Sequence, residues 1–276
     1  MAKQTVLITG CSTGFGKLSA QDFRAKGWNV IATMRTPEKE TELQTSDSML
    51  VTRLDVTDEA SINEAVNQGL GAFGQIDVLV NNAGYGARAM FEQSTDAIIR
   101  NMYETNVFGL MKASQAVLPA MRERGHGRII NVTSMAGMIG MPGNSIYSSS
   151  KFAVEGLTEA LAHEYSQLGV KVMSVAPGAF STTAFGTNAT SYLDGGDDKL
   201  QTHAKKLRAH FESIALSGTP QDPQLVADKI YACATEDMPV HNPVGADADG
   251  LAKLMQSVDN KQDFINIAAQ RLLPQG

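Results

Sequence analysis

Cysteine, tryptophan and long apolar stretches are scarce in this chain of 276 residues, and each scarcity excludes a class of protein. The two cysteines, Cys11 and Cys233, lie far apart without metal-ligand spacing, so we expect free thiols and no disulfide framework. Because no stretch of about 18 apolar residues is present, we expect no membrane-spanning helix. The N-terminal residues lack the long apolar segment of a secretory signal, and we expect a cytoplasmic protein.

Basic residues are also too few for a general nucleic-acid surface. The chain has 23 Lys and Arg against 29 Asp and Glu, which gives a formal net charge of -6. A nucleic-acid-binding protein needs a basic face, so we expect no nucleic-acid partner. Any binding of phosphate must therefore come from local groups.

Short apolar runs alternate with longer amphipathic stretches through the first two thirds of the chain. Buried runs separated by helices indicate a parallel sheet with helices on both faces. The sequence therefore predicts one α/β domain over residues 1–276, with a doubly wound parallel sheet. The runs are 6–8, 30–32, 49–54, 76–80, 128–132 and 170–175, and the helical stretches are 15–26, 58–73, 98–121 and 146–168.

Residues 178–223 break this alternation. They are rich in Gly, Ser, Thr and Asp, with a helical piece near residues 199–211. A connection this long in a compact domain is usually functional, so we expect a helical lid over a site. The remaining residues predict a helix, a short strand at 240–244 and two further helices as a C-terminal extension.

A glycine-rich turn follows the first apolar run and leads directly into a helix. Gly10, Gly14 and Gly16 allow the backbone to turn tightly and to approach a pyrophosphate, which the helix N-terminus binds. A P-loop is excluded, because Gly16-Lys17 is followed by Leu18 instead of Ser or Thr. On these residues alone, a purely structural turn remains the alternative.

The glycine spacing and the motifs after it resemble the short-chain dehydrogenase/reductase family. The first turn reads Thr-Gly-x3-Gly-x-Gly, and further matches follow in family order over residues 5–182. Residues 243–248 resemble the ending of the steroid- and retinoid-dehydrogenase-like branch. The resemblance implies a Rossmann-type fold. The further matches are Asp55-Val56, Asn81-Asn82-Ala83-Gly84, Asn106, Ser134, Tyr147, Lys151, Pro177-Gly178 and Thr182.

Tyr147 and Lys151 lie at i and i+4, on one face of a predicted helix. The ordinary pKa of tyrosine is about 10, and a nearby ammonium lowers it toward the range that acid–base catalysis needs. The resemblance implies that Tyr147 transfers the proton and that Ser134 hydrogen-bonds the substrate oxygen. It also implies that Lys151 holds the nicotinamide ribose and that Asn106 anchors a water. A polar side chain bonded to the helix backbone is the alternative for Asn106.

The resemblance also implies which residues bind the dinucleotide. Asp55 is expected to accept a hydrogen bond from the adenine amino group, and Asn82 to line the adenine ribose. Turn capping is the alternative for both residue types. The expected cofactor-binding residues are Gly10, Ser12, Thr13, Gly14, Phe15, Gly16, Arg35, Asp55, Val56, Asn82, Ala83, Gly84, Tyr147, Lys151, Pro177, Gly178, Phe180 and Thr182.

The choice between NAD and NADP depends on the end of the second run. An NAD site places an acidic residue there, whereas this chain has Met34 followed by Arg35. A guanidinium suits a 2′-phosphate, and Ser12 could add a hydrogen bond, so we expect NADP(H). A solvated Arg35 without such a role is the alternative.

The expected reaction is hydride transfer between NADP(H) and a small-molecule ketone, aldehyde or secondary alcohol of hydrophobic character, without a metal. Methionines and aromatic residues, which suit an adaptable apolar pocket, follow Ser134 and occur in the lid. An NAD-preferring alcohol dehydrogenase and a non-catalytic NADP-binding sensor or scaffold are alternatives. A sugar-nucleotide epimerase is disfavoured by the glycine spacing. The expected pocket residues are Tyr85, Met135, Met138, Ile139, Met141, Phe180, Phe185 and Tyr192.

The predicted helices over residues 101–121 and 150–167 carry apolar residues beyond what one core face needs. Family members commonly pair through these helices, so we expect a homodimer or homotetramer. Ordinary core packing is the alternative. The residues concerned are Val117, Leu118, Phe152, Val154 and Leu161.

Overall fold

Seven parallel strands form one sheet in the computed structural model, which describes residues 3–180, 190–217 and 219–274. The strand order is β3-β2-β1-β4-β6-β7-β9, so the chain changes direction across the sheet between β1 and β4. Such a switch point opens a crevice at the carboxyl ends of the strands. The strands are β1 (Thr5–Ile8), β2 (Asn29–Met34), β3 (Met49–Arg53), β4 (Val78–Asn81), β6 (Gly127–Val132), β7 (Val170–Pro177) and β9 (His241–Val244).

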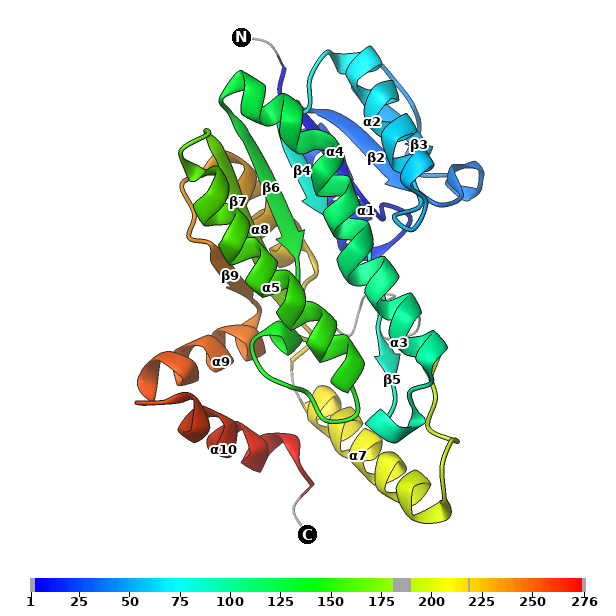
Figure 1. Cartoon of the computed structure of the whole chain (residues 1–276), viewed down its shortest axis with the longest axis vertical. Coiled ribbons are helices and arrows are strands. Elements are labelled where there is room, and N and C mark those ends of the chain that lie inside the picture. The colour runs from blue at the N-terminus through cyan, green and yellow to red at the C-terminus, as the bar shows by residue number, and fades with distance from the viewer. Residues whose placement is uncertain (1–2, 181–189, 218, 275–276) are drawn as a thin grey trace.

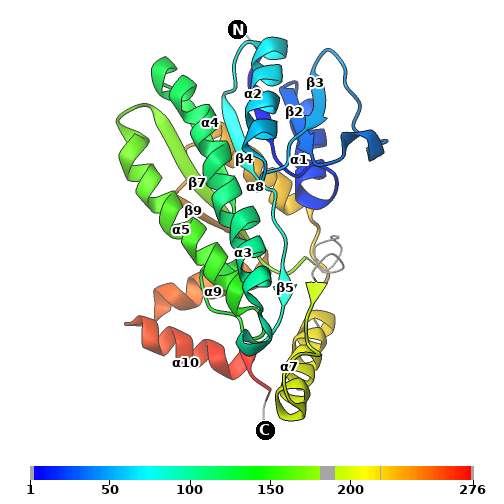
Figure 2. The same ribbon diagram turned by 45° about the vertical axis from the view of Figure 1, so that its right-hand side comes forward.

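Helices cover both faces of this sheet, as Figures 1 and 2 show. Side chains alternate between the faces along each strand, so Val6 and Ile8 pack with Phe23 on one face while Leu7 packs with Ile62 on the other. The result is a Rossmann-type doubly wound α/β fold, as predicted. One face carries α1 (Gly14–Ala25) and α8 (Gln224–Thr235), and the other carries α2 (Glu59–Phe73), α4 (Gly109–Arg124) and α5 (Ser145–Ser166).

The predicted helix over residues 98–121 contains one wide turn. α3 (Asp96–Tyr103) continues through a π-helical turn (Glu104–Phe108) into α4. A π turn inserts one extra residue into the helix and is frequent at functional sites. It contains Asn106, which is 1% exposed, so a residue of the candidate site lies at this irregularity.

A second, two-stranded sheet joins the predicted lid to the segment that follows β4. β8 (Thr190–Ser191) pairs in parallel with β5 (Ala87–Arg88), and α7 (Asp198–Ser217) follows it. The buried amide of Gln93, at the end of the short helix η2 (Phe91–Gln93), donates 2.9 Å hydrogen bonds to the carbonyls of Leu193 and Gly195. The sequence did not predict this connection, because two-residue strands carry no periodicity.

The C-terminal extension contains the two expected helices, α9 (Ala246–Ser257) and α10 (Lys261–Leu272). Phe264 of α10 is fully buried against Ile139, which follows the turn η4 (Met135–Gly137). The last segment of the chain therefore packs beneath a loop of the candidate site (Figure 2). The short helix η1 (Pro37–Lys39) lies at the opposite sheet edge, between β2 and β3.

The apolar residues expected at a subunit interface divide into two groups. Val117, Leu118 and Val154 are buried within the core of their own chain, so core packing accounts for them. Phe152 and Leu161 are half-buried. Phe108, at the end of the π turn, is 46% exposed.

Candidate active site

The turn after β1 has the geometry of a phosphate-binding loop. Gly10 and Gly14 have φ values of 75° and 58°, a left-handed conformation that favours glycine. A side chain at Gly16 would collide with the Gly10 carbonyl. The first turn of α1 has no acidic residue, and Thr13 makes no side-chain hydrogen bond at its N-cap. The helix N-terminus can therefore bind an anion such as a pyrophosphate.

The ends of β1 and β4 are held together by Thr9 and Asn82. The Thr9 hydroxyl accepts hydrogen bonds of 3.0 Å from the backbone amides of Asn82 and Ala83. The Asn82 amide donates to the carbonyls of Thr9 and Gly10 at 2.9 and 3.1 Å. The Asn82 side chain thus joins two turns at the switch point. These contacts match the alternative expected for Asn82, a turn-capping role.

Arg35 lies exposed where β2 ends, while Met34 is buried. The amide of Cys11 donates to the Thr33 carbonyl at 2.8 Å, so the loop with the exposed Ser12 runs alongside this strand end. Arg35 makes no ion pair with any of the described residues. Lys17, in contrast, is paired with two glutamates. With respect to the described residues, the Arg35 guanidinium is available to a 2′-phosphate.

Asp55 and Val56 both have local roles. One Asp55 oxygen accepts hydrogen bonds from the Thr57 amide at 3.0 Å and from the Thr57 hydroxyl at 2.8 Å, as in a capped turn. Val56 is 6% exposed and packs against Gly109, where a side chain would come within 2.7 Å of Val56. These contacts match the turn-capping alternative and leave the adenine contact of Asp55 a prediction.

Ser134, Tyr147 and Lys151 converge at the carboxyl end of β6. The Ser134 oxygen accepts a 3.1 Å hydrogen bond from the Ala136 amide and so caps η4. Tyr147 lies in the first turn of α5 and is 8% exposed. One turn later, Lys151 Nζ donates to the Val132 carbonyl at 2.9 Å and lies 5.7 Å from the centre of the Tyr147 ring.

Burial has the largest effect on the protonation of these groups. It raises the pKa of Tyr147 to about 12, and a hydrogen bond with Ser134 opposes this rise. It also lowers the pKa of Lys151 to about 8, which the charge of Glu155 opposes. The sequence predicts a lowered pKa for Tyr147, and this is not found, because desolvation of the phenol outweighs the hydrogen bond with Ser134. The protonated phenol is the form that can donate a proton to an alkoxide.

Asn106 connects the π turn with the loop after β4 and with α5. Its oxygen accepts from the Tyr85 amide at 3.1 Å, and its nitrogen donates to the Tyr85 carbonyl at 3.0 Å. Ser150, the neighbour of Lys151, is 3.3 Å from the same nitrogen. A side chain at Gly84 would lie 3.1 Å from the Asn106 oxygen and 3.7 Å from Lys151 Nζ. Asn106, Gly84 and Lys151 therefore lie together, as expected of one site.

Residues after β7 complete the region near the glycine-rich turn. Pro177 ends β7, and Gly178 has no room for a side chain because Asp247 occupies that space. Phe180 is buried, with its ring edge-to-face on Phe15 at a centroid distance of 5.4 Å. Thr182 and Phe185 lie outside the described residues.

The expected pocket residues are only partly gathered around Tyr147. Tyr85 and Met141 pack in the cluster that contains Tyr147, whereas Ile139 packs against α10. Tyr192 is 37% exposed. Met135 and Met138 are half-buried.

A cavity of about 370 Å³ lies between β8 and α7. It contains none of the four candidate catalytic residues, so we do not assign it to the substrate. It is lined by Ser191, Leu193, Asp194, Lys205, Arg208, Ala209 and Glu212.

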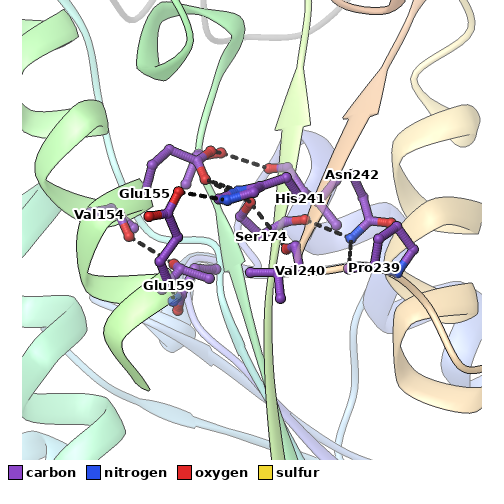
Figure 3. A network of polar contacts seen from close by, with 12 residues as sticks. Val154, Glu155, Glu159, Ser174, Pro239, Val240, His241 and Asn242 are labelled. Carbon is purple, nitrogen blue, oxygen red and sulfur yellow. Dashed lines mark hydrogen bonds and ion pairs between the residues drawn. The ribbon is translucent and has the colours of Figure 1, made fainter. Parts of the chain in front are cut away.

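A buried polar network behind Lys151 was not predicted from the sequence. Glu155, Ser174 and His241 meet between α5, β7 and β9 (Figure 3). The spacing of four residues between Lys151 and Glu155 places both on one helix face, which is the one indication that the sequence offers.

Comparison with known proteins agrees with this fold. The family model described as short chain dehydrogenase matches residues 4–192, and the chain belongs to that family. The 3-ketodihydrosphingosine reductase of Bacteroides thetaiotaomicron is 41% identical over 198 residues, 72% of each chain. Retinol dehydrogenase 8 of Bos taurus is 35% identical over 252 residues, which cover 84% of this chain and 79% of the bovine one. The second similarity agrees with the steroid- and retinoid-dehydrogenase-like branch.

Solved structures show the same fold. A short-chain dehydrogenase from Streptomyces avermitilis superposes with a TM-score of 0.82 at 35% identity, over 98% of both chains. ElxO with NADP bound superposes with a TM-score of 0.75 at 30% identity, over 90% of this chain and 99% of that one. The chain is therefore an oxidoreductase of a nicotinamide-dependent family.

The described residues contain neither a membrane-spanning helix nor a metal-ligand cluster. No helix among them is long and apolar enough to cross a bilayer. No group of three or more His, Cys, Asp or Glu among them could hold a metal ion.

Proposed function

We propose that this protein transfers a hydride between NADP(H) and a hydrophobic ketone, aldehyde or secondary alcohol, with Tyr147 as the acid–base residue. The observation that carries the proposal is the convergence of Ser134, Tyr147 and Lys151 at the carboxyl end of β6, with Asn106 beside them. When bound, NADP(H) supplies or accepts the hydride. The chain itself must orient the carbonyl and move the proton.

The residues present fit a dinucleotide. The N-terminus of α1, which has no acidic residue in its first turn, would hold the pyrophosphate. Gly10 lets the turn pass close to β4, because its conformation is left-handed and a side chain at this position would lie 2.9 Å from the Ala83 Cα. Arg35 would pair with the 2′-phosphate. Support for NADP comes from a guanidinium that forms no ion pair with the described residues and from the buried apolar Met34 where an NAD site needs an acid.

For reduction, the side chains act as follows. The Ser134 hydroxyl donates a hydrogen bond to the carbonyl oxygen and orients it. The Tyr147 hydroxyl donates its proton to the oxygen as negative charge develops there. Lys151 holds the nicotinamide ribose and stabilises the phenolate that remains. Asn106 fixes the backbone at Tyr85 and so keeps the floor of the site in place.

The substrate class follows from the surroundings of Tyr147. Tyr147 belongs to an apolar cluster with Met102, against which Tyr85 and Met141 pack, so a polar substrate would lose hydration without compensation. Two relatives are named as a reductase of a 3-keto compound and a dehydrogenase of retinol. We therefore propose a bulky apolar carbonyl compound, with residues 178–223 as the lid over it.

The test is oxidation of NADPH and of NADH, followed by absorbance, with ketones and aldehydes of graded size and apolarity. We expect turnover that favours NADPH and bulky apolar carbonyls. The variant Tyr147→Phe should lower kcat by at least about a thousandfold while the Kd for NADPH stays unchanged. Near-normal turnover by this variant would remove Tyr147 from the mechanism. Binding of NADPH without turnover on any carbonyl would favour the sensor or scaffold.

A further inference from the structure

Glu155 is a buried carboxylate one helical turn beyond Lys151. It is 9% exposed and accepts hydrogen bonds from the Thr133 hydroxyl and, at 2.8 Å, from the Ser174 hydroxyl. His241 Nδ1 lies 2.8 Å from its second oxygen. These partners satisfy both oxygens of the buried carboxylate.

The carboxylate is part of the same packed unit as the candidate site. A side chain at Gly137 would lie 3.1 Å from both Glu155 Cγ and the Lys151 carbonyl, so these two residues enclose the turn that Ser134 caps. Thr133, which hydrogen-bonds Glu155, directly precedes Ser134. Lys151 and Glu155 also share one face of α5, at i and i+4.

The outer end of the network reaches the surface. His241 Nε2 lies 2.9 Å from Glu159, and the imidazole is 45% exposed (Figure 3). The hydrogen bond with Glu155 raises the pKa of His241. The charged groups that act on His241 among the described residues are Glu155 and Glu159 of α5. From the other elements that pack on β9, Ser174 contributes a hydroxyl, and Asp247 of α9 is bonded to the Ala179 amide.

We propose that Glu155 is a positioning residue that acts through Lys151: its buried negative charge keeps the Lys151 ammonium protonated at the pH of the reaction. Lys151 needs this support, because burial in the same region disfavours its charge. The Val132 carbonyl supplies a dipole to Lys151, but among the described residues Glu155 is the charge that stabilises the ammonium. This inference depends on the proposed function only for the importance of that charge to catalysis.

The first test is a titration of Lys151 in the cofactor-free protein, followed by NMR of ε-¹³C-lysine and assigned with Lys151→Met. In Glu155→Gln, which keeps the size of the side chain but removes its charge, the Lys151 midpoint should fall by about one pH unit. Glu155→Asp, which keeps the charge, should recover most of this loss. Glu159→Gln is the matched control, because it removes an exposed carboxylate one turn further away, and it should leave the midpoint unchanged. An unchanged midpoint in Glu155→Gln overturns the proposal.

The second test is the pH profile of kcat/KM for carbonyl reduction. The alkaline limb should move to lower pH in Glu155→Gln by the same amount as the titration, because a neutral Lys151 no longer supports the phenolate. A uniform drop at every pH would indicate only a structural role and would overturn the proposal. Since the titration needs no turnover, a shifted midpoint in a protein that reduces no carbonyl contradicts the proposed function alone.

A surface variant covers the case in which Glu155→Gln does not fold. His241→Arg places a permanent positive charge against Glu155 and should lower the Lys151 midpoint by a few tenths of a pH unit relative to His241→Gln. Equal midpoints in these two variants would count against the proposal. Both substitutions lie at a half-exposed position, where the fold tolerates change.

Discussion

In the proposed function, the preference for NADP(H) over NAD(H) depends on Arg35, an exposed side chain where β2 ends. Charge-assisted hydrogen bonds to a phosphate are worth about 1.5–3 kcal/mol. We therefore expect Arg35→Ala to raise the Kd for NADPH by about 10- to 100-fold and to leave the Kd for NADH unchanged. Fluorescence titration with both nucleotides measures this.

Arg53→Ala is the matched control for Arg35→Ala. Arg53 is also exposed near the sheet edge but is paired with Asp58, so its removal should change neither affinity. If Arg35→Ala raised the Kd for NADPH and the Kd for NADH equally, the proposed contact of Arg35 with the 2′-phosphate would be wrong.

Individual residues of the site were predictable where their geometry is local. The roles of Tyr147 and Lys151 follow from the family resemblance and their shared helix face from the spacing, while the conformation of Gly10 follows from a tight turn. The partners of Asn106 and Asn82 were not predictable, because they lie in segments distant along the chain. The pKa of Tyr147 also depends on burial, which the sequence does not give. Thr182 remains a prediction, since the structure does not describe it.

At the level of elements, the strands and long helices of the sheet match the predicted runs closely. Each run alternates with a helix of clear periodicity, and the parallel order follows from such units. The π turn between α3 and α4 escaped prediction because the apolar periodicity continues across it. Within this turn, Asn106 hydrogen-bonds the loop at Tyr85, a contact between segments distant along the chain. The network around His241 depends on pairing between β7 and the edge strand β9, which spacing alone does not reveal.

The attachment of the lid gives a prediction at this scale. Gln93→Met keeps the volume of a buried side chain but leaves the carbonyls of Leu193 and Gly195 without their donor. An unsatisfied buried group costs about 1–3 kcal/mol, so the base of the lid should loosen. We expect the KM for a bulky carbonyl to rise about tenfold, while the Kd for NADPH stays the same.

Steady-state kinetics compared with Glu92→Gln checks the role of Gln93. Glu92 is the exposed neighbour in η2, and its substitution should have no effect. A Gln93→Met enzyme with normal KM would show that residues 190–195 do not bear on the substrate.

Over the whole molecule, the candidate site depends on segments from every part of the chain. The glycine-rich turn comes from the first strand, the acid–base pair from α5, and the support beneath the Ser134 loop from the last helix. Met141 contacts both the cluster around Tyr147 and the cluster around Phe264. The C-terminal extension therefore packs against residues that also pack at the site, although it contributes none of the candidate catalytic residues.

Phe264→Ala tests this connection. Phe264 is fully buried, and removal of its ring should lower the free energy of unfolding by about 3–5 kcal/mol, measured by urea denaturation. Because Met141 and Ile139 lose packing on the same side, the KM for the carbonyl should rise more than the Kd for NADPH, since the glycine-rich turn and Arg35 lie at the other half of the sheet, by β1 and β2. Ile265→Ala, at a 42% exposed neighbour, should change stability by no more than about 0.5 kcal/mol. If Phe264→Ala unfolds more easily but keeps a normal KM at temperatures where it is folded, the extension stabilises the fold without shaping the site.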